Sequence, residues 1–357
     1  MVAVAAGKQG ATVAGGGRHA RRKTDYKRKS EKGVEPVHDA QAEPTVGRPV
    51  TFLVTGGAGF IGSHLVDALL AAGRRVMVLD NLSVGKRDNV PEQAQLIEGD
   101  VGDEALLRRL MDEVDGCFHL AALSSTVLSH QRWLYSHRTN VGGTVTVLEC
   151  ARATAQRPAV PVVYASSAAV YGDNPDAPLA EQAKLQPFSA YGADKLGSEL
   201  HARVAGVVHG VPTVGLRLFN VFGPRQDPHS PYSGVISHFL LRAQQGEVLS
   251  IHGDGAQVRD FVHVRDAVRF LLAAMAHAQP TGQVYNVCTG QPTAILALAH
   301  LIIHLSGKGS GLQHSAARVG DIRVSIGDPD LAAQRLGIRT TMTLREGLRE
   351  MVASPAA

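Results

Sequence analysis

The feature that most constrains the fold of this 357-residue chain is a glycine-rich segment, Thr55 to Gly62 (TGGAGFIG). A continuous apolar run at residues 50–54 precedes it, as expected of a parallel strand that is buried on both faces. Apolar residues at helical spacing follow it as far as Ala72. The segment therefore predicts a tight turn between a buried strand and a helix.

Glycines at such a turn allow the pyrophosphate of a dinucleotide to approach the backbone, and the helix N-terminus offers free N–H groups to its phosphates. An ordinary strand-to-helix turn is the alternative, but the strand and helix patterns on both sides favour the dinucleotide. We expect cofactor contacts in this segment at Gly56, Gly59, Phe60, Ile61 and Gly62.

Strand and helix patterns then alternate along the chain. Further strand patterns occur at residues 75–79, 96–97, 116–120, 160–165 and 212–216, and a helical pattern occurs at residues 264–276. This alternation predicts an α/β fold with a Rossmann-like, doubly wound parallel sheet. After Phe219 the pattern breaks into segments rich in glycine and proline, which indicates a smaller C-terminal substrate-binding lobe. We expect the NAD-binding domain at residues 50–218, with 260–290 returning to it, and the lobe at residues 219–259 and 291–352.

Composition and charge argue against other classes of protein. No stretch approaches the roughly 20 apolar residues that a membrane-spanning helix needs. The pI of about 9.0 invites a nucleic-acid interpretation, but residues 1–49 carry a net charge of +5 against +4 for the whole chain, so the remainder is close to neutral. We expect residues 1–49 to be a disordered basic tail, solvated rather than bound to a polyanion or a membrane surface.

Cysteine and histidine usage indicates a reducing compartment and no metal site. The three cysteines, Cys117, Cys150 and Cys288, are far apart and have no paired spacing, which favours the cytoplasm. The histidines form no cluster with ligand spacing, so we expect no metal. Arg21 and Arg22 are not followed by an apolar region, so we expect no export signal.

Acidic residues at the predicted strand ends indicate which dinucleotide binds. Asp80 can accept hydrogen bonds from both ribose hydroxyls and repel a 2′-phosphate, so NAD is favoured over NADP. Lys86 and Arg87 lie close by and keep NADP open as an alternative. Asp100 follows the next strand and could reach the adenine edge or have no role, and Asn140 could fix a bulge or a water near the cofactor or cap a helix. The expected cofactor site also includes Asn81, Val101, Leu120, Ala121 and Ala122.

A serine, a tyrosine and a lysine form the expected catalytic group. Tyr191 and Lys195 are i and i+4 on a helix that is predicted to start near Ser189, so both project from one face and also contact the cofactor. Bringing a phenol from a pKa near 10 towards 7 takes roughly 4 kcal/mol, which a neighbouring ammonium and a cationic nicotinamide ring can supply. Ser167 closes a strand at residues 162–167 and can bridge a substrate oxygen and the phenolate. With the dinucleotide turn, this group predicts redox chemistry at a sugar hydroxyl.

Five further motifs identify a family. They are HLAA at residues 119–122, SSAAVYG at 166–172, RLFNVFGPR at 217–225, RDFVHVRD at 259–266 and YNVCTG at 285–290. With the residues above, the chain from Val50 almost to its end resembles the extended short-chain dehydrogenase/reductase superfamily, in particular its NAD-dependent nucleotide-sugar epimerases of the UDP-glucose and UDP-N-acetylglucosamine 4-epimerase type. The resemblance implies a UDP-sugar substrate and a homodimer formed through the helices near residues 140–152 and 189–208.

The resemblance also implies which residues bind the substrate. Asn220 and Arg259 would contact the nucleotide diphosphate, and Arg318 would be a second phosphate partner. Fixed guanidinium donors suit a diphosphate because they bind its oxygens bidentately, although a surface ion pair is the alternative for each arginine. Asp321 would lie near the uridine ribose. Ser325 would lie in the sugar pocket, where a small residue leaves room for an N-acetyl group.

Departures from the family pattern bear on the reaction. Dehydratases of the superfamily carry an acidic residue after the catalytic serine or threonine, whereas this chain has Ala168 and Ala169, which argues against dehydratase or decarboxylase chemistry. The segment at residues 130–133 (HQRW), which we expect to be a loop, and Val319 in place of a proline are atypical. The sequence thus favours a 4-epimerase of UDP-glucose or UDP-N-acetylglucosamine that passes through a transient 4-keto intermediate. The alternatives are a UDP-uronate 4-epimerase, a net NAD(P)-dependent reductase or dehydrogenase, and a non-catalytic homologue.

Overall fold

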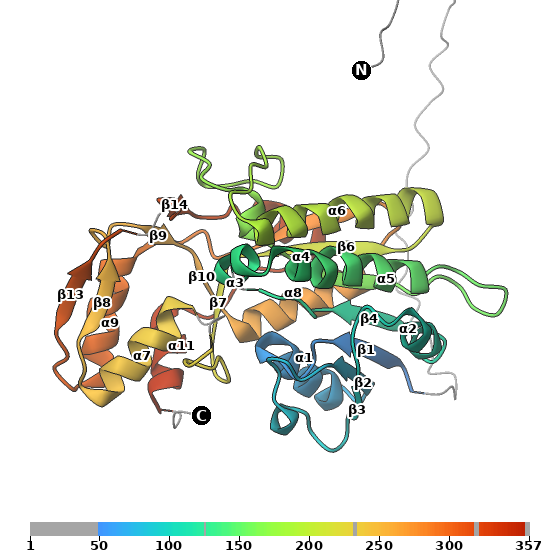
Figure 1. The fold of residues 1–357 in the computed structure, drawn as a ribbon, viewed down its shortest axis with the longest axis horizontal. Coiled ribbons are helices and arrows are strands. Elements are labelled where there is room, and N and C mark those ends of the chain that lie inside the picture. Colours follow the sequence, from blue (N-terminus) through green and yellow to red (C-terminus); the bar gives the residue numbers. More distant parts are fainter. Residues whose placement is uncertain (1–48, 125, 231–233, 318–320, 354–357) are drawn as a thin grey trace, which may run out of the picture. The chain divides into compact units, whose positions relative to one another are not determined.

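The central element of the fold is a seven-stranded parallel sheet. The computed structural model describes residues 49–353 apart from 125, 231–233 and 318–320, so all but the last residue of the predicted tail lies outside the described residues. The strand order is β11-β6-β5-β4-β1-β2-β3, and every neighbouring pair is parallel (Figure 1). The strands are β1 (Thr51–Thr55), β2 (Arg75–Asp80), β3 (Gln95–Glu98), β4 (Gly116–His119), β5 (Val162–Ser167), β6 (Thr213–Leu218) and β11 (Gln283–Val287). The predicted Rossmann-like parallel sheet is confirmed.

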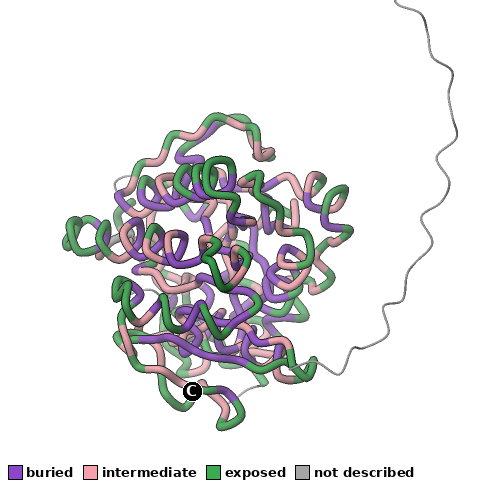
Figure 2. The backbone as a smooth tube through the Cα atoms, turned by 90° about the vertical axis from the view of Figure 1, so that its right-hand side faces the viewer, coloured by how far each residue is buried: buried purple, intermediate pink, exposed green. Residues whose placement is uncertain are grey.

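Helices cover both faces of this sheet and create two separate cores. One core includes α1 (Phe60–Ala71) and α8 (Val264–Ala276), and the other includes α2 (Glu104–Met111), α5 (Gly143–Cys150) and α6 (Ala190–His209). Neighbouring residues of one strand enter different cores, Val54 the first and Leu53 the second, because successive side chains point to opposite faces. Figure 2 shows buried residues gathered between the helices. None of the helices in the described part has the length and apolarity needed to cross a membrane.

Two short helices, α3 (Thr126–Gln131) and α4 (Trp133–His137), follow β4, so the predicted loop at residues 130–133 is wrong. α4 continues into a π-helix, η2 (Arg138–Gly142), before α5 begins. Helices this short are marginal on their own. Buried Ser136 of α4 donates a hydrogen bond to Asp194 of α6 at 3.1 Å, so contact with a distant helix stabilises the segment. The local sequence does not reveal that contact.

A third hydrophobic core lies outside the central sheet, in the part of the chain drawn at the left of Figure 1. Helices α7, α9 and α11 build it together with strands β7, β8 and β10. β7 pairs with β10, β8 with β13, and β9 with both β12 and β14. The sequence pattern does not predict β13 and β14, because each pairs only with a distant strand. The bounds of the remaining elements are η1 (Arg87–Asn89), η3 (Ala168–Val170), β7 (Asn220–Phe222), α7 (Val235–Gln245), β8 (Leu249–His252), β9 (Val258–Arg259), β10 (Phe261–His263), β12 (Thr293–Ala294), α9 (Ile295–Ser306), β13 (Leu312–Ser315), β14 (Val324–Ser325), α10 (Asp330–Leu336) and α11 (Leu344–Ala353).

A buried ion pair joins the central sheet to α6. Arg217 of β6 donates two hydrogen bonds, of 2.9 and 2.8 Å, to the two carboxylate oxygens of Glu199 of α6. The two side chains are 5% and 6% exposed. A further guanidinium nitrogen donates to the hydroxyl of Tyr171 (2.9 Å) and to the carbonyl of Glu181 (2.8 Å). Burying two charges is expensive unless their hydrogen bonds are satisfied as they are here, so the pair fixes the position of α6 on the sheet.

We predict that Arg217→Gln lowers the free energy of unfolding by about 3–5 kcal/mol, because Glu199 would stay buried without its cation. Urea denaturation of the purified protein measures this change. Arg339→Gln is the matched control, since Arg339 forms an exposed pair with Asp330 and exposed pairs contribute only about 0–1 kcal/mol. Equally small effects of the two substitutions would contradict the stabilising role of the buried pair.

Candidate active site

The predicted cofactor and catalytic residues lie at the carboxyl edge of the central sheet. β1 is placed between β2 and β4, so the direction of winding reverses at this strand. Ligands of open α/β sheets bind outside the carboxyl ends of the strands at such a switch point. The turn after β1, Asp80 at the end of β2 and Ser167 at the end of β5 all lie at this edge.

The turn after β1 needs its glycines for close backbone contacts. Gly56 has a φ of +71°, and a Cβ there would lie 2.7 Å from the backbone nitrogen of Ala121. A Cβ on Gly62 would overlap the carbonyl oxygen of Gly56. Gly59 is the N-cap of α1 and provides no capping side chain for the N–H groups of the first turn. These N–H groups form a cradle that suits a phosphate.

Asp80 lies where a carboxylate for the ribose is expected. It is buried and accepts hydrogen bonds from the N–H groups of Ala58 (3.0 Å) and Leu82 (2.9 Å). Burial raises the pKa of Asp80, and these two donors oppose the rise. Because each carboxylate oxygen can accept more than one hydrogen bond, the group can still receive those of the ribose hydroxyls.

Two basic side chains near Asp80 have acidic partners. Lys86 Nζ lies 3.3 Å from a carboxylate oxygen of Asp227, and Arg87 Nη2 lies 2.7 Å from one of Glu98. A cation that binds a 2′-phosphate would have to give up such a partner. Because both pairs are largely exposed and such pairs contribute only about 0–1 kcal/mol, it is the buried carboxylate of Asp80 that favours NAD over the NADP alternative.

Other predicted cofactor residues flank this turn. Asn81 Nδ2 donates a hydrogen bond to Asp100 at 3.2 Å, so the ends of β2 and β3 are joined. Val101 is buried in the second core, between the sheet and α2 and α5. Phe60 and Ile61 are the first residues of α1, and Ile61 packs against the first core. Packing in the cores therefore explains in part why apolar residues occupy positions 61 and 101, independently of a ligand.

Asn140 fixes the loop that follows β4 and contains residues 120–122. Its side-chain oxygen accepts a hydrogen bond from the N–H of Leu123 (2.8 Å), and its Nδ2 donates to the carbonyl of Leu123 (3.2 Å). It lies inside the π-helix η2, a rare form that occurs mostly as a bulge at functional sites. Of the two structural roles that the sequence left open for Asn140, the geometry matches the local bulge rather than the helix cap.

Ser167, Tyr191 and Lys195 form one cluster between β5 and the first turns of α6. α6 begins next to Ser189, as predicted, and the Ser189 hydroxyl caps it by accepting a hydrogen bond from an N–H of the first turn at 3.0 Å. Lys195 donates to the carbonyl of Ala165 on β5 at 2.8 Å, and its Nζ lies 5.8 Å from the centre of the Tyr191 ring. The Ser167 hydroxyl is close enough to the Tyr191 phenol to act on the pKa of that phenol as a hydrogen-bond donor. The four-residue spacing of Tyr191 and Lys195 therefore brings the ammonium close to the tyrosine ring, as expected.

Burial acts against the charged forms of two members of this cluster. It raises the pKa of Tyr191, and the hydrogen bond from Ser167 opposes the rise. It lowers the pKa of Lys195 to about 8, with Asp194 and Glu199 acting in the other direction. The sequence predicts a phenol pKa lowered towards 7. The structure shows that desolvation outweighs the hydrogen bond from Ser167, so the expected activation needs further positive charge at the site.

The predicted substrate residues lie on β7, β9, β14 and the segment before β14. Asn220 begins β7, and Arg259 of β9 pairs in register with Ser325 of β14. Arg259 Nη2 donates a hydrogen bond to Asp321 at 2.6 Å, so the ion pair that was the alternative role for Arg259 does form. The partner in this pair, Asp321, is itself a predicted substrate residue. Arg318 and Val319 lie outside the described residues.

Sequence reasoning missed the buried polar residues that support the catalytic helix. Glu199 and Asp194 of α6 are both buried and bond to other elements. His119, at the end of β4, accepts or donates hydrogen bonds with Thr55 (2.8 Å) and Thr144 (3.1 Å), and burial lowers its pKa to about 3. The available signal was the position of the two acidic residues: Asp194 directly precedes the motif lysine, and Glu199 follows it by one helical turn. The partners of both residues are distant in sequence, so the sequence did not reveal them.

A dinucleotide turn at the switch point of a parallel sheet, with a Ser-Tyr-Lys cluster at the same edge, defines a protein of the short-chain dehydrogenase/reductase superfamily. Residues 52–288 match the model of the NAD dependent epimerase/dehydratase family. The chain belongs to this family, and the resemblance drawn from its motifs is confirmed.

Relatives of known sequence and structure agree. A putative UDP-glucose 4-epimerase of Methanocaldococcus jannaschii is 34% identical over 304 residues, which are 84% of this chain and 96% of the relative. The crystal structure of a UDP-glucose 4-epimerase of Thermotoga maritima with UDP-glucose superposes with a TM-score of 0.81 at 36% identity, covering 85% of this chain and 97% of the other. A UDP-N-acetylglucosamine 4-epimerase of Methanobrevibacter ruminantium, solved with UDP-N-acetylmuramic acid, superposes with a TM-score of 0.80 at 34% identity. The match covers 86% of this chain and 98% of the other.

We predict that Gly62→Ala weakens NAD binding by at least about tenfold, because a strain of only about 1.4 kcal/mol gives that factor. The added Cβ would push α1 away from the backbone of the turn, so the phosphate cradle would open. Titration calorimetry with NAD measures the affinity. Gly311→Ala is the control, since the atom nearest to its Cβ would lie at 3.7 Å. Unchanged NAD affinity in Gly62→Ala would show that the turn does not hold the dinucleotide.

Proposed function

We propose that the protein is an NAD-dependent 4-epimerase of a UDP-hexose. The observation that carries this proposal is the cluster of Ser167, Tyr191 and Lys195 beside the dinucleotide turn. The relatives named above, UDP-glucose and UDP-N-acetylglucosamine 4-epimerases, support the substrate class. The donor set also fits NAD, because Asp80 is available for the ribose and the first turn of α1 offers N–H groups that no capping side chain occupies.

The cluster has the groups that reversible oxidation at C4 requires. Bound NAD would supply reversible hydride transfer at C4 with no net consumption. Tyr191 would take the proton of the C4 hydroxyl and return it, and Ser167 would bridge the sugar oxygen and the phenol. Lys195 would stabilise the phenolate with its ammonium, which stands 5.8 Å from the ring centre.

The diphosphate would be the anchor about which the sugar turns. Asn220 and Arg259 would bind it, Arg318 would be a second phosphate partner, and Asp321 would lie near the uridine ribose. With the nucleotide held, the 4-keto sugar can rotate about its diphosphate linkage and present its other face without leaving the site. Ser325 is small and buried, which supports a pocket that also admits an N-acetyl group.

The residues after Ser167 favour epimerisation over dehydration. The backbone N–H of Ala169 donates to the Ser167 hydroxyl at 3.1 Å, so the 3-10 helix η3 brings Ala168 and Ala169 directly beside the catalytic serine. Neither side chain can donate a proton to a leaving hydroxyl. A 4-keto sugar formed here would have no acid from this segment to drive loss of water.

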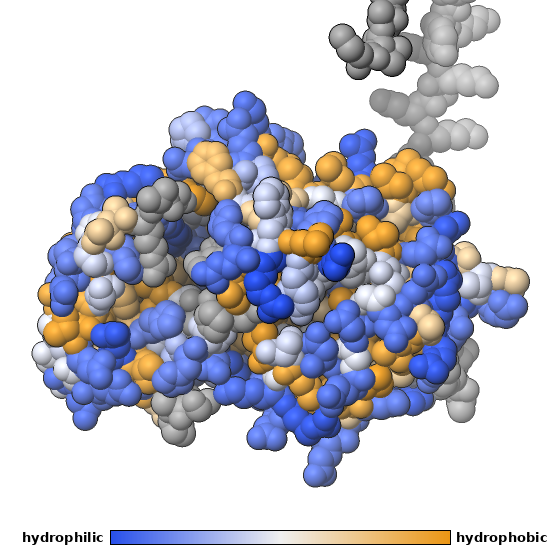
Figure 3. All heavy atoms as spheres, viewed as in Figure 1, coloured by the Kyte–Doolittle hydropathy of each residue, from blue (hydrophilic) through white to orange (hydrophobic). Residues whose placement is uncertain are grey.

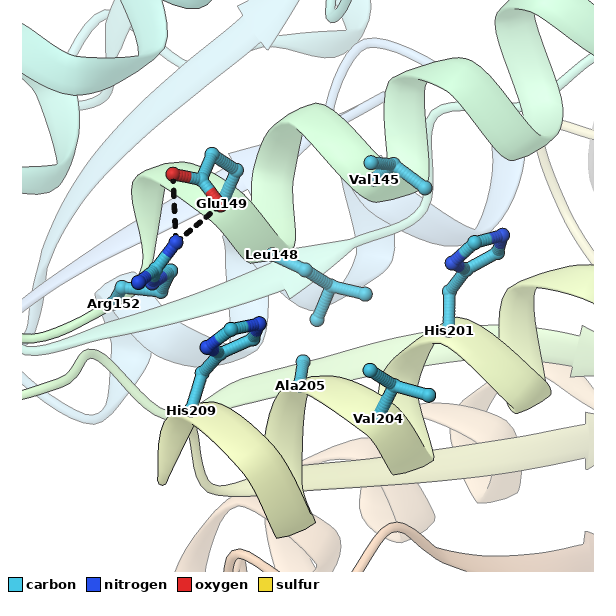
Figure 4. Close-up of a pocket in the computed structure, with 8 residues that line it drawn as sticks. All are labelled: Val145, Leu148, Glu149, Arg152, His201, Val204, Ala205 and His209. Carbon is cyan, nitrogen blue, oxygen red and sulfur yellow. Dashed lines mark hydrogen bonds and ion pairs between the residues drawn. The ribbon is translucent and has the colours of Figure 1, made fainter.

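A second copy of the chain is the proposed partner, through α5 and α6. Figure 3 shows hydrophobic residues gathered on the surface over α6, where Val204, Val207 and Val208 are 50–67% exposed. A shallow pocket of about 100 Å³ separates α5 from α6, lined in part by Val145 and Val204 (Figure 4). A contiguous exposed apolar face of this kind is typical of an interface, which supports a homodimer.

We predict that Val204→Glu converts the dimer to a monomer. Each copy would bring one carboxylate into the interface, and the two like charges would be buried facing each other across a two-fold axis. Light scattering after size-exclusion chromatography gives the mass. Val248→Glu is the matched control, since Val248 is also exposed (44%) and lies between α7 and β8, away from this face. A wild-type protein of monomer mass would refute the proposed interface.

We also propose a separate substrate lobe and a cytoplasmic location for this protein. The substrate lobe at residues 219–259 and 291–352 is supported by the separate core that α7, α9 and α11 share. A cytoplasmic location is supported by Cys117, Cys150 and Cys288, which are all free and buried.

Incubation of the purified protein with UDP-glucose and with UDP-N-acetylglucosamine, without added cofactor, tests the proposed function. We expect the C4 epimer of one or both, resolved by anion-exchange chromatography, with no lasting change in the absorbance of reduced cofactor. A stoichiometric change in that absorbance would instead indicate a net reductase or dehydrogenase. If neither is converted, a third incubation with a UDP-uronate follows, and conversion of that substrate alone would indicate a uronate epimerase.

We predict that Tyr191→Phe retains NAD and loses epimerisation by about 100-fold or more, the usual contribution of a general acid–base group. The substitution removes only the phenolic hydroxyl, so the fold and the cofactor site should persist. The same chromatographic assay gives the rate, and the absorbance of the purified protein gives its NAD content. An active Tyr191→Phe protein would refute the assigned role.

A further inference from the structure

Lys195 has two buried carboxylates close by on its own helix, and their surroundings differ. Glu199 is held by two hydrogen bonds from Arg217, so a permanent cation balances its charge. Asp194, whose side chain is 4% exposed, accepts hydrogen bonds from Ser136 and Asn140 and contacts the ring of His137. Among these described partners of Asp194 there is no guanidinium or ammonium.

The three partners hold the Asp194 carboxylate in one place. Ser136 Oγ donates at 3.1 Å, His137 Nδ1 lies at 2.9 Å, and Asn140 Nδ2 lies at 3.4 Å. They come from α4 and the π-helix η2, which the sequence does not predict and which exist through contact with α6. The same Asn140 also bonds Leu123 in the loop after β4. The carboxylate is therefore a fixed charge, tied to both the catalytic helix and the loop at the cofactor edge.

We propose that Asp194 is a positioning residue that acts through Lys195: its carboxylate, which no permanent cation among its described partners neutralises, is the negative charge that keeps this lysine in the ammonium form while the phenolate of Tyr191 is needed. This role rests on the proposed epimerase function, because it concerns the pH range in which that reaction runs.

The other charges around Lys195 do not replace that of Asp194. Burial is the largest influence on Lys195 and lowers its pKa to about 8; Asp194 is the first of the groups that oppose it and Glu199 the second. On β4, His119 is buried, and burial lowers its pKa to about 3, so it brings no positive charge near neutral pH. Tyr191 is a further titratable neighbour, and Lys195 Nζ lies 5.8 Å from its ring centre. Without Asp194, the ammonium would be lost at lower pH.

Three variants test the charge of Asp194. Asp194→Asn removes the charge and keeps the shape. His137→Arg places a permanent cation against Asp194 at a position where the native ring is 56% exposed, so the fold can accept it, and His137→Gln is its neutral control. Asp112→Asn is a control for the loss of a carboxylate elsewhere, since Asp112 is 63% exposed and pairs with Arg157.

Two readouts are taken on each protein with NAD bound. The first is the titration of Lys195 by NMR of protein labelled with ¹³C at lysine Cε, assigned by its loss in Lys195→Arg. The second is the pH profile of epimerisation. In the wild-type protein we expect Lys195 to titrate near pH 8 and the rate to fall near the same pH. In Asp194→Asn we expect both transitions to occur about one pH unit or more lower. His137→Arg should shift both in the same direction, and the two controls should shift neither.

Separate results distinguish this role from a structural one and from the proposed function. A rate lowered equally at every pH in Asp194→Asn, with an unmoved Lys195 titration, would mean that Asp194 only stabilises the fold and would overturn the proposal. If Asp194→Asn does not fold, an unmoved titration in His137→Arg would overturn it equally. If wild-type protein epimerises no UDP-hexose but the Lys195 titration shifts as expected, the electrostatic role stands and the epimerase function fails.

Discussion

The close approach of two backbone segments at the carboxyl end of β1 is the constraint on which the site depends. β1 pairs with β2 on one side and β4 on the other, so the turn after β1 and the loop after β4 must pass each other at the switch point. They do so at a separation that leaves no room for a Cβ on Gly56. The same packing brings the N-terminus of α1, Asp80 and the loop held by Asn140 to one edge. Glycine is thus required first by the backbone, and the phosphate cradle follows from that geometry.

Helix α6 is the second element on which the site depends, and buried charge determines how it is held. One of its faces carries Tyr191 and Lys195 against β5, and the charges beneath it must be satisfied because water is excluded. Glu199 solves this with Arg217 of β6, which anchors the middle of the helix to the sheet. Asp194 solves it with neutral donors and an imidazole from α4 and η2. The first arrangement neutralises its carboxylate, whereas the second leaves a negative charge beside the lysine.

Much of this site could be predicted from the sequence because its signals are local. The strand that ends at Ser167, the helix start near Ser189 and the helical spacing of Tyr191 and Lys195 each depend on residues within a few positions of one another, and each is found in the structure. The supporting contacts could not be predicted, because they join distant residues by side-chain packing. Arg217 and Glu199 are 18 residues apart on different elements. The helices α3 and α4 replace a predicted loop for the same reason, since α6 stabilises them.

The substrate side follows the same rule that buried or half-buried charges find partners, with a consequence for binding. Arg259 is 16% exposed, burial lowers its pKa, and Asp321 opposes this from 2.6 Å. Under the proposed function, a diphosphate that binds Arg259 would not meet a free cation; it would compete with Asp321 for the guanidinium. The net gain is then the difference between two charge-assisted interactions, which is smaller than the interaction with the diphosphate alone. Such an exchange lets the guanidinium remain paired before and after binding, and it makes the affinity for the nucleotide sensitive to whether Asp321 finds a new partner, such as a ribose hydroxyl.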